Sequence, residues 1–128
     1  VLFRHADANV LAQVVPAMNP AQLARLIGPG RRILGAPENG WADGMLTLNR
    51  DEVWPAPYSG PMRLDHETMK RIESVRFRWL AIRTTAYLRR YANDATANVP
   101  NDKLQVWVKR WLQSAAGFGV TEEAAFRK

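Results

Sequence analysis

Cysteine is absent from this chain of 128 residues. Its absence excludes disulfides, thiolate zinc sites and cysteine nucleophiles, and it fits a reducing compartment such as the cytoplasm. Long apolar runs are lacking too, because every stretch falls short of the roughly 20 residues that a membrane-spanning helix needs. With 47% hydrophobic and 23% charged residues, the composition is that of a globular protein.

Positive charge is abundant but unevenly distributed. The formal net charge is +6, from 18 Lys and Arg against 12 Asp and Glu. Residues 1–57 hold five of each sign, so the thirteen basic and seven acidic residues of 58–128 carry the whole excess. A basic region attracts nucleic acid, anionic lipid or an acidic protein, and charge alone does not choose among them.

The first part of the chain predicts two short helices and a strand pair. Val1–Arg4 resembles the end of a strand, so we expect the chain to begin inside a fold, as the later part of a longer protein. Asp7 or Asn9 can cap the next helix. Asn19-Pro20 starts another helix, which Gly28-Pro29-Gly30 ends. Two segments predict antiparallel strands: Arg31–Leu34 and Met45–Leu48.

A proline-rich spacer separates this part from a helical one. Three prolines within residues 55–61 are incompatible with a helix or a central strand. We therefore predict an incomplete lobe over 1–54, a linker over 55–61 and a helical lobe over 62–128. The expected fold class is α+β and mostly α-helical. The helices expected in the second lobe are Asp65–Tyr91, Asp102–Ala116 (capped by Asn101 or Asp102) and one starting at Thr121.

Residues with catalytic chemistry are few and scattered. His5 and Asp7 lie far from His66 in the sequence, without the spacing of a metal site. Gly28–Gly30 precedes two arginines, but it follows a helix and lacks the Gly-Lys-Ser/Thr ending of a phosphate-binding loop. No catalytic constellation is apparent. We predict that the chain is not an enzyme and binds no metal or cofactor.

The long helix is more informative, because it carries an arginine row between two apolar arcs. Arg76, Arg83 and Arg90 recur at i, i+7 and i+14, and the apolar arcs are wide enough for the helix to pack on two sides. In one interpretation the arginine stems cover a core while their charged ends reach water. In the other, the row faces a partner protein and pairs with its carboxylates.

The next helix carries two tryptophans one turn apart, Trp107 and Trp111. As core residues they would join this helix to Trp79 on the long helix. As exposed residues they would form a groove for a partner, since Trp and Arg are enriched at interface hot spots. A cofactor site is a third and weaker interpretation.

Nucleic-acid binding is an alternative for these basic helices. Their cations could contact phosphates, and their aromatic rings could stack on bases. The arginines lie among large apolar residues, however, and a polar connector between the helices does not fit a helix-turn-helix. We therefore expect nucleic acid to be a less favoured partner than protein.

Several short motifs follow one another along the chain. They are Phe3-Arg4-His5-Ala6-Asp7, Val10-Leu11, Pro16, Pro20-Ala21-Gln22-Leu23, Gly28-Pro29, Arg76-Phe77-Arg78, Tyr87-Leu88-Arg89-Arg90 and Gly117–Glu123. Their order resembles that of the effector-associated adaptors, or chaperones, of type VI secretion. The second half resembles the helical C-terminal lobe of that family, with an Arg-rich helix and with Gly117–Glu123 similar to the family's Tyr-Gly-Ile/Leu-Thr-x-Glu ending. Where the family commonly has Asp-Pro-Arg-Val, this chain has Asp7-Ala8-Asn9-Val10.

The resemblance implies a non-catalytic adaptor in the bacterial cytoplasm. Such a protein binds a secreted effector and helps to load it onto the VgrG or PAAR proteins of the secretion spike. No membrane partner is implied. From the residues and this resemblance together, the expected partner-binding residues are Arg76, Trp79, Arg83, Tyr87, Arg90, Trp107 and Trp111.

Overall fold

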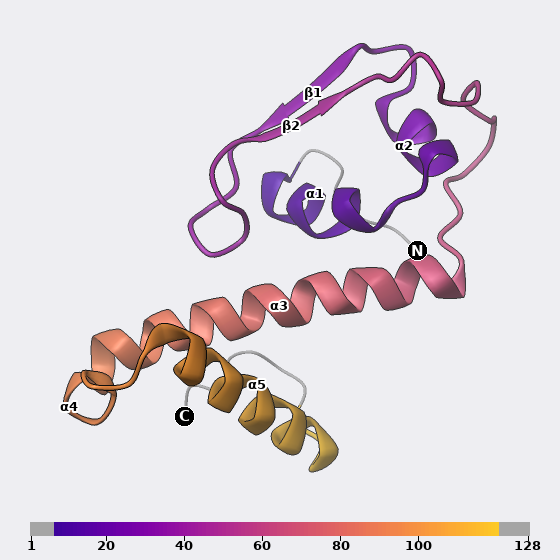
Figure 1. Cartoon of the computed structure of the whole chain (residues 1–128). Helices are drawn as coiled ribbons and strands as arrows, with labels where there is room; N and C mark the ends of the chain where they lie inside the picture. The colour runs from indigo at the N-terminus through magenta and orange to yellow at the C-terminus, as the bar shows by residue number, and fades with distance from the viewer. Residues whose placement is uncertain (1–6, 121–128) are drawn as a thin grey trace. The chain divides into compact units, whose positions relative to one another are not determined.

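The computed structural model describes residues 7–120, and within them the fold is α+β and mostly α-helical (Figure 1). The predicted strand at Val1–Arg4 and the predicted helix from Thr121 lie outside the described residues. In chain order the elements are α1 Ala8–Val14, the 3-10 helix η1 Val15–Ala17, α2 Pro20–Ile27, β1 Arg32–Gly35, β2 Leu46–Asn49, α3 His66–Tyr91, α4 Asn93–Thr96 and α5 Asn101–Gly117.

The chain forms two compact units, Val1–Arg76 and Phe77–Lys128. They divide inside α3, whereas the sequence suggested a linker at residues 55–61. The reason is local packing: Met62, Leu64 and Ile72, which follow the spacer, all belong to the hydrophobic cluster of the first unit. The first turns of α3 are therefore part of the first unit.

Helix ends in the first unit lie where the sequence placed them, because side chains cap them. The Asp7 carboxylate accepts from the backbone N–H of Asn9 at 2.9 Å and starts α1. Asn19 and Gln22 form a reciprocal capping box at the start of α2. Gly28 ends α2 with a φ of +56°, a conformation that favours glycine.

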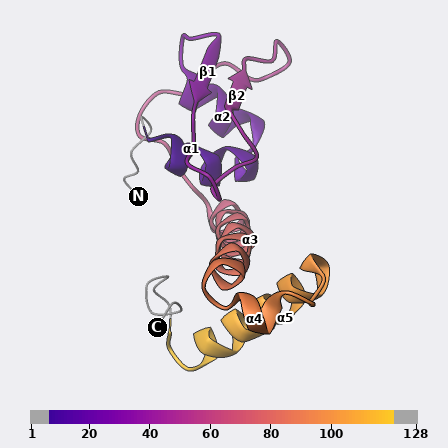
Figure 2. The ribbon, with the colours of Figure 1, turned by 90° about the vertical axis from the view of Figure 1, so that its left-hand side faces the viewer.

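Strands β1 and β2 form a two-stranded antiparallel sheet, shifted by one residue from the predicted bounds. The sheet covers α1 and α2 (Figures 1 and 2). Ile33 pairs with Leu48, which is buried, while Leu34 pairs with Thr47 on the outer face and is 58% exposed. The alternation of strand side chains thus sends one row toward the helices.

The core of the first unit lies between α1, α2 and the first turns of α3. The buried cluster consists of Val14, Ala17, Met18 and Ile72, with Val10, Leu23, Leu26, Met62, Leu64 and Met69 packed against it.

The second unit has its own core, where α5 packs against the C-terminal half of α3. The buried cluster consists of Ala81 from α3 and Leu104, Val108 and Leu112 from α5. Ala81 has the smallest of these side chains, and its 0% exposure shows that the helix surface around it is covered. A stripe with spacing i, i+4 and i+8 on α5 therefore fixes which side of that helix faces inward.

Two expectations about the region between α3 and α5 were wrong. The connector contains the short helix α4, and α5 begins after Pro100, with no capping side chain at that end. Asn101 instead accepts from Arg89 at 2.9 Å, and the same guanidinium donates to the carbonyls of Thr96 and Val99. Arg89 thus supplies the polar contacts that close the turn into α5.

Candidate functional site

The second unit exposes a row of aromatic side chains on α5 and at its C-terminal cap. Trp107 is 44% exposed, Trp111 is 55% exposed and Phe118 is 88% exposed. Separations of four and seven residues place all three on one side of a helix. We call these three residues the aromatic row.

The aromatic row is distinct from the buried stripe of α5. Leu104, Val108 and Leu112 are 1%, 0% and 3% exposed. Each tryptophan directly precedes a member of this stripe, so at 3.6 residues per turn it lies about 100° around the helix. The interpretation of Trp107 and Trp111 as core residues is thus wrong, and the alternative of an exposed pair agrees with their accessibility.

Cations accompany the N-terminal half of the aromatic row. Lys103 lies one turn before Trp107, and Arg110 lies between the two tryptophans; both are exposed. Neither forms an ion pair with any residue between 7 and 120, where the ion pair found joins Arg71 to Glu67. We call Lys103 and Arg110 the basic rim. Asp102 is the only acidic residue of α5.

The arginines predicted on α3 do not share a face with the aromatic row. Ala81 and Leu88 pack in the core that α5 covers. Arg83 and Arg90 each lie two residues further along, which places them about 160° around α3. Arg83 is half-buried and Arg90 is exposed. Arg76 is also exposed and belongs to the first unit.

Aromatic residues surround the end of that arginine row. The rings of Tyr87 and Tyr91 lie 4.7 Å apart, and the Arg90 guanidinium lies 5.3 Å from the centre of the Tyr91 ring. Trp79 is only 6% exposed, and Arg78 lies 5.3 Å from its ring centre. The Trp79 indole is therefore part of the interior and offers little surface to a partner.

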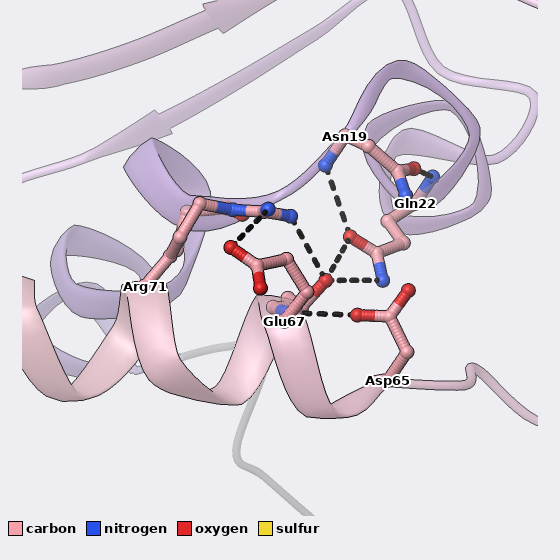
Figure 3. Close-up of polar contacts among 7 residues, drawn as sticks. Asn19, Gln22, Asp65, Glu67 and Arg71 are labelled. Atoms are coloured by element: carbon pink, nitrogen blue, oxygen red, sulfur yellow. Dashed lines mark hydrogen bonds and ion pairs between the residues drawn. The ribbon is translucent and has the colours of Figure 1, made fainter.

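The first unit contains a polar network in which the buried Gln22 joins α2 to α3 (Figure 3). The Gln22 amide donates to the Arg63 carbonyl at 3.1 Å and to the Thr68 hydroxyl at 3.0 Å. Arg71 donates to the Thr68 hydroxyl and, at 2.8 Å, to the Ala17 carbonyl. Each of these contacts connects parts of the first unit.

A hollow of about 700 Å³ adjoins this network, between the start of α2 and residues 58–65. Its carboxylate, Asp65, accepts from the Thr68 backbone N–H at 2.7 Å and starts α3. That hydrogen bond, which favours the ionised form, lowers the pKa of Asp65 below its ordinary 3.8. The amides and the carboxylate that line the hollow are thus hydrogen-bonded to neighbouring residues. No nucleophile in the lining is paired with a base.

The other candidate residues have structural positions. Asp7 caps α1, His66 is the first residue of α3, and His5 lies outside the described residues. Between residues 7 and 120, no group of three or more His, Asp or Glu side chains could hold a metal ion. The Gly28–Gly30 segment ends α2, and the carbonyls of both glycines accept from Arg50. No described helix is long and apolar enough to cross a membrane.

Comparison of the chain with family models, with curated proteins and with solved structures found no match.

Sequence reasoning missed one member of the aromatic row. In the sequence, Phe118 is part of the Gly117–Glu123 motif and was not predicted to bind a partner. Its position seven residues after Trp111 was the available signal, because that spacing brings a side chain back to the same side of a helix. Gln22 was also missed, although its position three residues after Asn19 is the spacing of a capping box.

Proposed function

We propose that this chain is a non-catalytic adaptor that binds another protein through the aromatic row of α5. The observation that carries the proposal is the exposure of Trp107 and Trp111 on a helix that already has a complete buried stripe. Large aromatic side chains left in water at helical spacing are costly to solubility, and contiguous apolar surface of this kind marks interaction sites.

The chemistry of the row favours a polypeptide as the partner. Tryptophan contributes more binding energy than most residues, because its large ring removes much apolar surface from water when a partner covers it. The basic rim lies beside it and is free of ion pairs among residues 7–120. Cations next to an apolar row favour docking with oppositely charged partners, since they raise association rates and set orientation.

The expected client is a secreted effector of type VI secretion. This part of the proposal rests on the ordered motifs that resemble the adaptors of that system. The adaptor would shield apolar client surface in the bacterial cytoplasm and help to load the client onto the VgrG or PAAR spike proteins. The arginine row of α3 (Arg76, Arg83 and Arg90) and Tyr87 are proposed as further client contacts outside the aromatic row.

The test is complex formation with the effector encoded next to this chain's gene. The two proteins should co-elute at a fixed stoichiometry, and nuclease treatment should leave the complex intact. Trp111→Ala should weaken the complex about 30-fold, the effect of a hot-spot loss of roughly 2 kcal/mol.

Leu34→Ala is the matched control. Leu34 is 58% exposed, close to the 55% of Trp111, but it lies on β1 in the first unit. Its substitution should change the affinity less than about threefold, as expected of a residue outside the hot spot. Equal affinities of the two variants, or a complex that nuclease dissolves, would overturn the proposal in favour of another surface or of nucleic acid.

A further inference from the structure

The charges near α5 are distributed asymmetrically along the aromatic row. The cations of the helix, Lys103, Lys109 and Arg110, all lie in its first ten residues. Residues 111–120 contain no charged residue, although the row continues to Phe118. A ligand that follows the whole row would thus meet positive charge at one end and only apolar surface at the other.

The second unit as a whole also carries more cations than acids. Between residues 77 and 120 the second unit holds seven Arg and Lys but only two acids, Asp94 and Asp102. With so few acids available, the basic rim stays without an ion pair among the described residues. A partner that brings carboxylates would supply the negative charge that the basic rim lacks. The ion pairs would be strongest where apolar side chains next to them exclude water.

The row has the length and shape of a helix-binding surface. From Trp107 to Phe118 it spans twelve residues, and the two ends are about 16 Å apart along the helix axis, or three turns. A partner helix satisfies its own backbone hydrogen bonds and can lie against aromatic rings without burying unpaired N–H or C=O groups. An extended strand would need an exposed sheet edge, and α5 offers none.

We propose that the aromatic row binds an acidic amphipathic helix of the client. Client carboxylates pair with the basic rim, and the client's apolar side chains cover the rings. The inference deepens the proposed function, on which it rests, by naming the partner segment. It also sets the direction of docking, because the acidic end of the client helix lies over the first half of α5.

Single-stranded nucleic acid fits this surface less well. Bases can stack on exposed rings, but each nucleotide also brings a phosphate that needs a nearby cation. The uncharged stretch 111–120 supplies none after Arg110, so Phe118 has no neighbouring cation within that stretch. The phosphates of a polyanion would therefore find cations along only half of the aromatic row.

The test uses the full chain and three labelled probes, with binding measured by fluorescence anisotropy. The first is a designed 18-residue helical peptide with leucines on one face and glutamates beside them in one half only. It is made in two versions, with the glutamates in the N-terminal half or in the C-terminal half. The second replaces each glutamate by lysine, and the third is single-stranded oligothymidine. The glutamate peptide should bind at least about tenfold more tightly than the lysine peptide, and its affinity should fall with salt.

Arg110→Glu and Lys109→Glu form a matched pair, because both reverse one charge on adjacent residues. Arg110 lies beside the aromatic row, whereas Lys109 is a further 100° around the helix. Arg110→Glu should weaken the glutamate peptide about five- to tenfold, and Lys109→Glu less than about threefold. The double change Lys103→Glu and Arg110→Glu should make the lysine peptide the better ligand, a gain that an unfolded protein could not produce.

Three results would overturn the inference: equal affinity for the two peptides, equal effects of Arg110→Glu and Lys109→Glu, or tighter binding of oligothymidine than of the glutamate peptide. The inference and the proposed function can fail separately. If the effector complex depends on Trp111 but not on the basic rim, the adaptor function stands and the acidic helix is wrong. If the glutamate peptide binds as expected but the effector does not, the adaptor function is wrong.

Discussion

Two valines on α5 provide a direct test of which side of that helix faces inward. Val108 is 0% exposed and Val106 is 49% exposed, so the same change to alanine should have different effects two residues apart. The comparison is informative because the aromatic row is exposed only if the Leu104, Val108 and Leu112 stripe is buried.

The expected loss of stability for Val108→Ala follows from three terms. Removing two buried methyl groups costs about 1.6 kcal/mol in transfer free energy, at roughly 0.8 kcal/mol each. If about 40 Å³ of the space stays empty, the cavity adds about 1 kcal/mol. The better helix propensity of alanine returns about half a kcal/mol. The free energy of unfolding should therefore fall by about 2 kcal/mol, well above the effect of an average surface change.

Val106→Ala should change the free energy of unfolding by no more than about 0.5 kcal/mol in either direction. Its side chain is half exposed, so the small loss of buried area is offset by the gain in helix propensity. The two variants share their chemistry and their helix, and they differ only in the side of α5 on which they lie.

The assay is urea unfolding, followed by far-UV circular dichroism and by tryptophan fluorescence. With a urea dependence of about 2 kcal/mol per molar, Val108→Ala should lower the midpoint by about 1 M and Val106→Ala by less than about 0.3 M. Similar midpoints for the two variants, or a larger shift for Val106→Ala, would refute the orientation of α5 and with it the exposed aromatic row.

Two further predictions concern the start of α3. The lowered pKa of Asp65 stabilises the fold above the ordinary carboxyl pKa of 3.8, and this stability is lost as the pH falls through the lower folded value. Wild type should therefore have a higher urea midpoint than Asp65→Asn at neutral pH, and the difference should shrink in acid; a constant difference would contradict the assignment. Gln22→Leu should cost about 1–3 kcal/mol, because the Arg63 carbonyl and the Thr68 hydroxyl lose a donor. In a double-mutant cycle with Thr68→Val the two losses should be coupled by at least about 0.5 kcal/mol, and strictly additive losses would argue against the contact.

Local features of the sequence were sufficient to place most helices. Asp7, Asn19 and Asp65 act within their own first turns, where the side chain meets backbone N–H groups two or three residues away. Such contacts need no tertiary partner, and they can be recognised from residue type and spacing. The antiparallel strand pair was predicted for the same reason, from two apolar segments separated by turn-forming residues.

Features that depend on distant residues were harder to predict. The proline-rich segment suggested a boundary, yet the compact units divide at Arg76 and Phe77, inside a continuous helix. Composition does not reveal that Met62 and Ile72 pack with residues of α1 and η1, because such contacts join parts of the chain some 50 residues apart. The predicted capping of α5 by Asn101 or Asp102 was wrong for a similar reason, since the Asn101 side chain accepts from Arg89 across the turn.

The sequence by itself predicted that residues 102–116 form a helix and that Trp107 and Trp111 lie one turn apart on it. It did not determine whether these tryptophans are buried, because periodicity records the spacing of apolar residues but not which of them meets another helix. The tertiary structure decided this through Ala81, whose small side chain accommodates the Leu104, Val108 and Leu112 stripe. Trp107 and Trp111 lie about 100° around α5 from this stripe, outside the cluster that contains Ala81. Packing of the aliphatic stripe therefore left Trp107, Trp111 and Phe118 at the surface.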